Sequence, residues 1–253
     1  MSHSDRMSAA HRLRFQLHAR TRRHQFMIRL ARERVGEWLA LVERPYVAFS
    51  TGKDSTCVLS LVREQRPDTP AVYFDADCAY PESATMIAVT PGVMVWPADE
   101  PLLDTLARYG LEAGAELEQA TMRTTVWGPI RRLLAAHAFD GTALGLRAAE
   151  SFGRRLNART KGAVYRYKRD GVWACQPIFD WSYDDVWAYI VANDLTYCGV
   201  YDKQWDMPEA NQRLSYWAGE SNRQFGRYAW LRRHYPELFN RLAAQFPEAR
   251  NYV

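Results

Sequence analysis

The chain has 253 residues, of which 47% are hydrophobic and 25% charged, a balance that is ordinary for a folded globular protein. It excludes a disordered, collagen-like or low-complexity chain, and no run of about 18 apolar residues is present to span a membrane. The net charge of +4 is uneven, because residues 1–42 hold nine arginines and three acids. The first residues lack the apolar segment of a secretion signal, so we expect a cytoplasmic protein with no membrane partner.

Four cysteines, Cys57, Cys78, Cys175 and Cys198, are scattered along the chain. They are too few for a disulfide scaffold. None of them forms a Cys-x-x-Cys or Cys-Cys pair, which is the usual basis of an iron–sulfur cluster or a structural zinc site. We therefore expect no iron–sulfur cluster and no zinc.

The segment 11–42 is basic and has apolar residues at helical spacing, which predicts one helical arm that ends before Pro45. Three interpretations stay open for it. The arm could pack on the body or on a second subunit, it could contact the phosphates of a nucleic acid, or it could be a transit peptide.

Short apolar runs alternate with helical patterns after the arm, and this alternation predicts an α/β fold with a mostly parallel sheet and helices on both faces. The expected strands cover 46–50, 71–75, 92–96 and 142–146, and the expected helices cover 55–63, 81–89, 102–109 and 126–137.

The pattern changes after Arg147. Two apolar runs, 163–167 and 172–175, flank Asp170-Gly171 and predict a hairpin. Ser182 with Asp185 three residues later predicts a helix start, and Asp180 and Asp185 are interpreted as structural caps. We expect a basic helical arm over 1–44, a nucleotide-binding domain over 45–205 and a C-terminal helical extension over 206–253 packed on the same domain.

A polar loop lies between the first expected strand and the helix that follows it. Its glycine allows backbone N–H groups to approach an anion closely, and the helix N-terminus adds positive potential. The hydroxyl groups can donate hydrogen bonds, and the lysine supplies a point charge. The loop is not a Walker A motif. It consists of Ser50, Thr51, Gly52, Lys53, Asp54 and Ser55.

This loop resembles the SGGKDS pyrophosphate loop of the N-type ATP pyrophosphatases, the adenine nucleotide α-hydrolase superfamily. Thr51 replaces the first glycine, a mild change if its φ is negative. Within that superfamily the chain is similar to the phosphoadenosine phosphosulfate (PAPS) reductase family. The similarity covers about 45–205 and includes the segments 74–82, 145–151 and 177–187, with Tyr201-Asp202 after them.

The resemblance implies a three-layer, mostly parallel sheet with an adenine nucleotide, ATP or PAPS, at the carboxyl ends of its strands, and Mg²⁺ beside it. It implies catalytic roles for Lys53, Asp54 and Arg147. The residues expected to bind the nucleotide and its phosphates are Ser50, Thr51, Gly52, Lys53, Asp54, Ser55, Asp75, Gly145, Arg147, Glu150, Ser151, Arg154 and Arg155.

Two of these residues have open alternatives. Asp75 could bind Mg²⁺, accept hydrogen bonds from the nucleoside or be a water-exposed loop acid. Arg147 could bind a phosphate or sulfate in a fork, or be a surface arginine. The stretch 147–169 holds eight cations and one acid, Glu150, and is interpreted as an anion-binding lid over a polyphosphate or a nucleic acid, or as a solvated face.

PAPS reductases attack with a cysteine in a C-terminal Glu-Cys-Gly-Ile/Leu-His segment, whereas no cysteine follows Cys198 here. Three functions remain. The first is an enzyme that cleaves ATP at the α-phosphate and releases pyrophosphate, activating an acceptor in sulfur-transfer chemistry. The second is a sulfonucleotide reductase or PAPS-binding enzyme that uses an external thiol. The third is a nucleotide-sensing module without turnover that acts with a protein partner. A homodimer is also possible.

Overall fold

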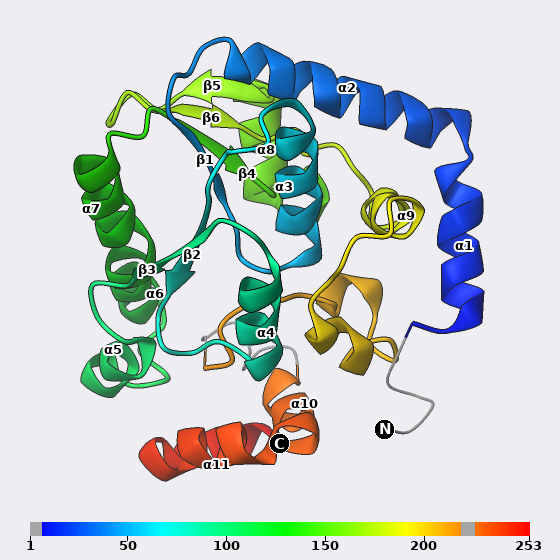
Figure 1. The fold of residues 1–253 in the computed structure, drawn as a ribbon. Coiled ribbons are helices and arrows are strands. Elements are labelled where there is room, and N and C mark those ends of the chain that lie inside the picture. Colours follow the sequence, from blue (N-terminus) through cyan, green and yellow to red (C-terminus); the bar gives the residue numbers. More distant parts are fainter. Residues whose placement is uncertain (1–6, 219–225) are drawn as a thin grey trace.

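A six-stranded sheet forms the centre of the computed structural model, which describes residues 7–218 and 226–253. The strand order is β3-β2-β1-β4-β6-β5, and all neighbours are parallel except β5 and β6 (Figure 1). The expected α/β class is confirmed. The strands are β1 (Pro45–Ala48), β2 (Ala71–Asp75), β3 (Val93–Pro97), β4 (Gly141–Leu144), β5 (Val164–Arg166) and β6 (Trp173–Cys175).

The central strands are short apolar runs because both of their faces are covered. Val47 of β1, Val72 of β2 and Ala143 of β4 are all fully buried. Parallel strands between two helical layers need apolar side chains on both faces, so a continuous apolar run is their expected pattern. The predicted hairpin is also confirmed, since β5 and β6 pair antiparallel and Gly171 in the turn has a φ of +70°.

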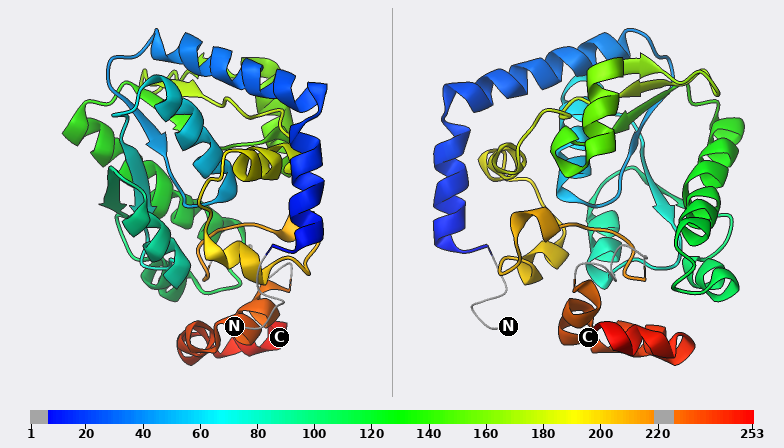
Figure 2. Two further views of the ribbon diagram at one scale, coloured as in Figure 1. Left: turned by 45° about the vertical axis from the view of Figure 1, so that its right-hand side comes forward. Right: turned by 180° about the vertical axis from the view of Figure 1, so that it is seen from behind.

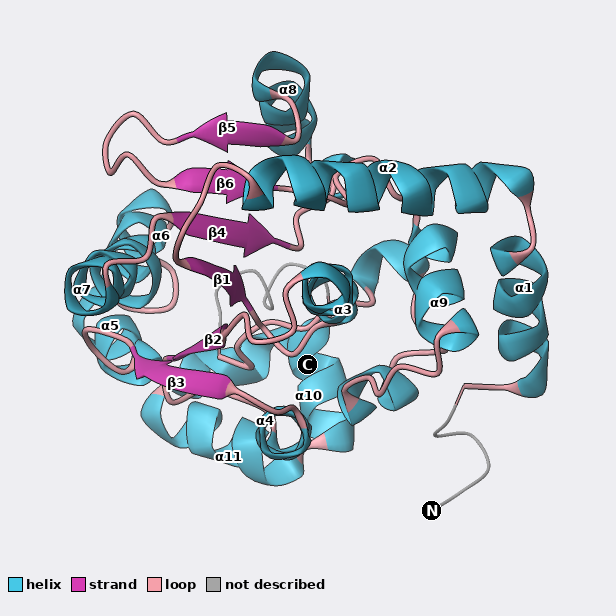
Figure 3. Ribbon diagram, turned by 45° about the horizontal axis from the view of Figure 1, so that its top comes forward, coloured by secondary structure: helices cyan, strands magenta, loops and turns pink. Residues whose placement is uncertain are grey.

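Helices cover both faces of the sheet (Figures 1 and 3). One face carries α3 and α4, with α2 and α9 packed beside α3, and the other carries α5, α6 and α7. The helices of this body are α3 (Lys53–Gln65), α4 (Pro81–Val89), α5 (Leu102–Tyr109), α6 (Ala115–Met122), the π-helix η1 (Arg123–Trp127), α7 (Gly128–His137), the 3₁₀ turn η2 (Ala148–Glu150), α8 (Phe152–Lys161) and α9 (Tyr183–Ala192).

The chain reverses its direction across the sheet between β1 and β4. It runs outward from β1 to β2 and β3, and then returns to place β4 on the other side of β1. The loops that follow these two neighbouring strands, 49–52 and 145–147, therefore diverge at one edge of the sheet. Open α/β sheets bind their ligands in the crevice that such a reversal creates at the carboxyl ends of the strands.

The arm consists of two helices, α1 (Ala9–Ala19) and α2 (Arg22–Leu39), and the prediction of one helix is wrong. Thr21 causes the break, because its hydroxyl donates to the His18 carbonyl at 2.8 Å and accepts from the His24 N–H at 3.2 Å. The arm lies against the body (Figure 2): Phe15 is fully buried, and its ring centroid lies 6.0 Å from that of Trp187 in α9.

The C-terminal segment is helical, as expected, and its apolar residues join the same core. Phe15 of the arm, Leu61 of α3 and Leu242 near the C-terminus belong to one buried cluster. No helix within the described ranges is long and apolar enough to cross a membrane. The division at 44 and 205 stays a prediction. The elements are η3 (Gly199–Lys203), η4 (Glu209–Asn211), α10 (Arg227–His234), α11 (Pro236–Gln245) and η6 (Pro247–Tyr252).

Candidate active site

The polar loop after β1 meets the loop after β4 at the N-terminus of α3. Gly52 is the N-cap of α3 in extended conformation, so the positive end of this helix faces the crevice. Gly145 packs directly on the loop: a Cβ at this position would lie 2.7 Å from the Ser55 nitrogen and 2.8 Å from the Asp54 carbonyl carbon. Only glycine lets the two loops approach this closely.

Two ion pairs, Lys53 with Asp54 and Arg147 with Asp54, hold the polar loop in place. The Asp54 carboxylate accepts from the Lys53 ammonium at 2.9 Å and from Arg147 Nε at 2.6 Å, and all three side chains are largely buried. Burial by itself raises the pKa of Asp54, but the charges of Lys53 and Arg147 outweigh it and hold this pKa below its ordinary value. Asp54 is therefore ionised, and it neutralises much of the charge of both cations.

Tyr201 of η3 closes one side of the loop. Its hydroxyl oxygen accepts the backbone N–H of Lys53 at 3.2 Å. Burial and the charge of Asp54 raise the pKa of Tyr201 well above its ordinary value, so the phenol stays protonated. Because its oxygen already accepts a hydrogen bond from the loop, the O–H proton can be donated to an anion in the crevice.

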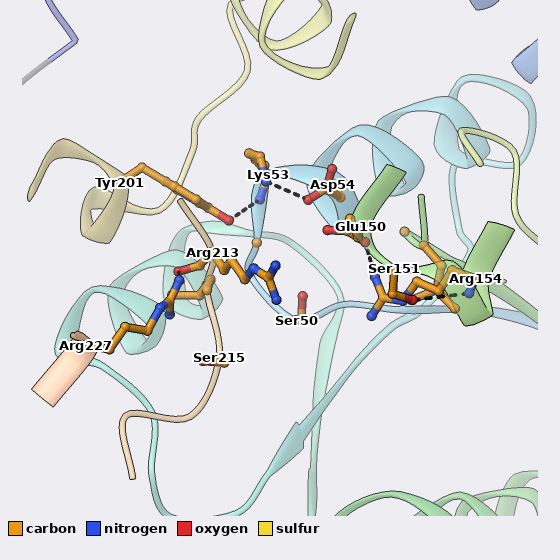
Figure 4. Close-up of a pocket in the computed structure, with 14 residues that line it drawn as sticks. Ser50, Lys53, Asp54, Glu150, Ser151, Arg154, Tyr201, Arg213, Ser215 and Arg227 are labelled. Carbon is orange, nitrogen blue, oxygen red and sulfur yellow. Dashed lines mark hydrogen bonds and ion pairs between the residues drawn. The ribbon is translucent and has the colours of Figure 1, made fainter. Parts of the chain in front are cut away.

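A polar cavity of about 350 Å³ opens above the loop. Figure 4 shows Arg154 on one side of Ser50, and Arg213 and Arg227 on the other. Arg154 pairs with Glu150, and Arg227 is almost fully buried and donates to the Arg213 carbonyl. Burial lowers the pKa of Arg227 below its ordinary value. Positive charge on opposite walls suits an anionic ligand.

A second cavity, of about 300 Å³, adjoins the first and is lined mostly by apolar surface. Ser50, Leu214 and Ser215 line both cavities. The apolar walls include Ala48 of β1, Phe49 directly after it, and Tyr73 and Phe74 of β2. The site thus has an apolar compartment next to a cationic one, as a nucleotide requires for its base and its phosphates.

Most residues expected to bind the nucleotide lie together at the polar cavity. Its lining contains Ser50, Gly52, Lys53, Asp54, Gly145, Glu150, Ser151 and Arg154.

Five expected residues do not line this cavity. Arg147 lies beneath the loop, and Ser55 turns its hydroxyl to the Gly52 carbonyl. Arg155 lies over the ring of Phe152. Asp75 accepts the N–H of Asp77 at 2.9 Å and lines neither of the two cavities.

The fifth, Thr51, does not meet the condition of a negative φ under which its replacement of a glycine would be mild. Its φ is +60°, in the left-handed region that disfavours a β-branched residue. The side chain is fully buried, and its hydroxyl donates to Ser83 at 3.1 Å instead of facing the cavity. This buried hydrogen bond compensates part of the backbone strain.

Sequence reasoning missed the residues that the C-terminal segment contributes, above all Arg213 and Arg227. The segment 206–253 is rich in arginine, tryptophan and tyrosine, which was the available signal. It could not show which arginines reach the crevice, because they come from the far end of the chain and depend on the tertiary fold.

A family model, the phosphoadenosine phosphosulfate reductase domain, matches residues 44–238, more than half of the chain. The chain belongs to the PAPS reductase family. The enzyme named phosphoadenosine 5'-phosphosulfate reductase from Pectobacterium carotovorum is 31% identical over 182 residues, which cover 68% of this chain and 72% of that protein. The enzyme of that name from Xanthomonas euvesicatoria is 29% identical over 167 residues, which cover 62% of this chain and 66% of its relative, just under two thirds.

The fold agrees with a solved member of this family. The crystal structure of PAPS reductase from Candida auris in its phosphate complex has a TM-score of 0.57 and 13% sequence identity, and the match covers 84% of this chain and 97% of that one. This similarity supports the three-layer fold with its parallel sheet.

The expectation of no iron–sulfur cluster is contradicted. U34-tRNA thiolase NcsA from Methanococcus maripaludis, solved with its 4Fe-4S cluster, resembles this chain with a TM-score of 0.47 and 12% identity, over 90% of this chain and 79% of that one. That protein carries a cluster, and the exclusion of a cluster is withdrawn for this chain.

Proposed function

We propose that this protein binds an adenine nucleotide across the two joined cavities and cleaves ATP at its α-phosphate, releasing pyrophosphate. The observation that carries this proposal is the shared wall of Ser50, Leu214 and Ser215, because a single ligand can then occupy both compartments. The apolar cavity takes the adenosine, and the cationic cavity takes the phosphates.

The proposed reaction activates an acceptor for sulfur transfer. An oxygen or sulfur atom of the acceptor forms a bond to the α-phosphorus, and the bond from this phosphorus to the bridging oxygen of the β-phosphate breaks. The electron pair of the broken bond leaves with pyrophosphate. Arg154, Arg213 and the N-terminus of α3 stabilise the charge that develops on this leaving group.

Lys53, Asp54 and Arg147 act on this reaction through the loop. Lys53 and Asp54 line the cavity and Arg147 does not, but all three side chains are largely buried, and Asp54 pairs with both cations. We assign them the task of holding the loop backbone in a fixed position, since a preorganised site does not need to reorganise during the reaction. Tyr201 supplies a hydroxyl donor beside the same loop.

A second function has its own support. The relatives from Pectobacterium and Xanthomonas are named as PAPS reductases, and the cationic cavity suits a sulfate or an additional phosphate as well as a polyphosphate. In this alternative one thiolate of an external dithiol attacks the sulfur of the sulfonucleotide, and the bond from this sulfur to the phosphate oxygen breaks, so that the nucleotide phosphate leaves with the electron pair. The second thiolate then attacks the sulfur of the first thiol, which releases sulfite and oxidises the dithiol to a disulfide. Nucleotide binding without turnover, coupled to a protein partner, is the third possibility.

The test measures pyrophosphate from ATP and sulfite from PAPS supplied with a dithiol, both in a magnesium-containing buffer, beside calorimetric binding of the two nucleotides. Release of pyrophosphate with tighter binding of ATP supports the first function. Sulfite release without pyrophosphate supports the second and contradicts the first. Nucleotide binding without either product, over a panel of oxygen and sulfur acceptors, supports the sensing function and contradicts the other two.

Two neighbouring arginines provide a matched pair of variants for this test. Arg154 lines the cavity, whereas Arg155 on the next position of α8 does not. Arg154→Gln removes a charged hydrogen-bond donor worth about 1.5–3 kcal/mol, so nucleotide affinity should fall by about tenfold or more. Arg155→Gln should leave affinity unchanged. Equal behaviour of the two variants would exclude the cationic cavity as the phosphate site.

A further inference from the structure

Two histidines and one aspartate come together far from the proposed reaction, at the junction of the arm and the body. The Asp185 carboxylate oxygen Oδ1 lies 2.7 Å from His18 Nε2 and 3.0 Å from His24 Nδ1. One candidate ligand atom from each residue lies within 4.8 Å of the others. No function described above uses this cluster.

Three helix ends bring the cluster together. His18 lies at the end of α1, His24 in the first turn of α2 and Asp185 in the first turn of α9. The break at Thr21 turns the chain so that both histidines face the same carboxylate. Figure 3 shows α1, α2 and α9 meeting at this corner of the molecule.

The cluster is oriented before any ligand arrives. The second carboxylate oxygen of Asp185, Oδ2, accepts from the backbone N–H of Ser182 at 2.9 Å and from its hydroxyl at 2.6 Å. These bonds direct Oδ1 toward the histidines. His24 is fully buried, and Nδ1 is the ring nitrogen that it presents to the cluster. Preorganised ligands bind a metal ion more tightly than mobile ones.

The lack of cysteine pairs led to the expectation of no zinc, but the ligand types and the spacing of this His–His–Asp cluster suit a zinc ion. Imidazole nitrogen and carboxylate oxygen are common zinc ligands, and bond lengths near 2.1 Å in a tetrahedron separate ligand atoms by about 3.4 Å. The distances of 2.7 and 3.0 Å from Asp185 Oδ1 to the two ring nitrogens need to lengthen by about 0.4–0.7 Å for an ion to replace the two hydrogen bonds.

The cluster has a route to solvent. The His18 side chain is 20% exposed, while those of His24 and Asp185 are fully buried. An ion can therefore enter past His18 and keep a water molecule as its fourth ligand. Arg23 also reaches Asp185 Oδ2, at 3.4 Å, but its side chain is 60% exposed and can turn away into solvent.

We propose that His18 Nε2, His24 Nδ1 and Asp185 Oδ1 form a binding site for Zn²⁺ or a similar divalent transition-metal ion. The ion connects the arm helices α1 and α2 to α9 and stabilises their contact. The cluster is also linked to Arg147, which pairs with Asp54 of the polar loop. Ser182 donates hydrogen bonds to Asp185, and the carbonyl of its neighbour Trp181 accepts a hydrogen bond from Arg147 at 3.5 Å.

The test uses the full chain without a polyhistidine tag, freed of metal with a chelator. Co²⁺ is titrated and its visible absorption recorded, because tetrahedral Co²⁺ gives intense bands that free Co²⁺ lacks. Zn²⁺ should displace it, bind at one ion per chain in calorimetry and raise the melting temperature. These readouts do not depend on nucleotide turnover, so the metal site and the proposed function can fail separately.

Two histidine variants on the same helix separate the site from unspecific binding. His18→Ala removes the partly exposed ligand and should weaken Zn²⁺ binding by at least about tenfold. Mutating a residue that only hydrogen-bonds to a metal ligand already lowers metal affinity by about tenfold or more, and the loss of a ligand itself should cost at least as much. His11→Ala should bind as the parent chain does, because His11 stacks on Trp205 outside the cluster. Circular dichroism of the metal-free variants checks that both fold.

The proposal is overturned if the metal-free chain binds no Zn²⁺, and in that case the three residues form only a hydrogen-bonded contact between the arm and the body. Equal Zn²⁺ affinity of His18→Ala and the parent chain also overturns it.

Discussion

The close contact between Gly145 and the polar loop of residues 50–55 leads to a quantitative prediction. In Gly145→Ala the new Cβ would lie 2.7 Å from the Ser55 nitrogen, and ordinary contact begins at 3.4 Å. The loop or the end of β4 must then move by about 0.7 Å. Overpacking of this kind costs about 1–3 kcal/mol. Because the obstructing atoms are backbone, a change of side-chain rotamer cannot relieve the clash.

The same displacement should weaken nucleotide binding. Hydrogen bonds from the loop lengthen when Gly52 and its neighbours shift, and each 1.4 kcal/mol lost corresponds to about tenfold in affinity. We expect Gly145→Ala to lower the free energy of unfolding in urea by about 1–3 kcal/mol and to lower ATP affinity in calorimetry by about tenfold or more.

Gly153→Ala is the matched control. A Cβ on Gly153 in α8 would meet no atom within 4 Å, so stability and affinity should stay close to those of the parent chain. Parent-like stability and affinity in Gly145→Ala, or an equal loss in Gly153→Ala, would refute the role of this contact.

Three further predictions concern the same loop. Thr51→Gly and Thr51→Val both lose the hydrogen bond to Ser83, but only glycine relieves the positive φ, so urea unfolding should show Thr51→Gly to be more stable than Thr51→Val by about 1–2 kcal/mol. Equal stability would mean that the backbone is not strained. Asp54→Asn leaves Lys53 and Arg147 buried without their anion and should destabilise the fold by about 3–5 kcal/mol in the same assay; a loss below about 1 kcal/mol would contradict this. Since the folded-state pKa of Asp54 is depressed, its contribution is fully present above the unfolded pKa of about 3.9 and is lost as the pH falls through the folded-state pKa. Unfolding measured from pH 7 downward should therefore show a shallower acid decline in Asp54→Asn than in the parent chain, and parallel curves would argue against the depressed pKa.

The sheet and the main loop were predictable because their signals are local. Apolar runs such as 71–75 determine buried strands, and the glycine, lysine and hydroxyls of 50–55 occur directly after one of them. The strand order then brings the loops after β1 and β4 together without further information.

Features that depend on tertiary contacts were not predictable. Thr21 breaks the arm inside a continuous helical pattern, since one hydroxyl serves both helix ends. Arg213 and Arg227 line the polar cavity. No pattern in the sequence of their segment shows that these two arginines face the cavity. The positive φ of Thr51 depends on a buried hydroxyl of Ser83, which belongs to another helix.

The burial of Phe15 means that the arm helices, α1 and α2, cannot be deleted without a loss of stability. Its ring fills a space between Tyr183, Trp187 and Trp205, and deleting a buried phenylalanine side chain costs about 3–5 kcal/mol. Shortened versions that begin at the first strand would leave these three aromatic rings open to water. A soluble, folding-competent fragment for biochemistry therefore has to retain both arm helices, even if only the crevice is of interest.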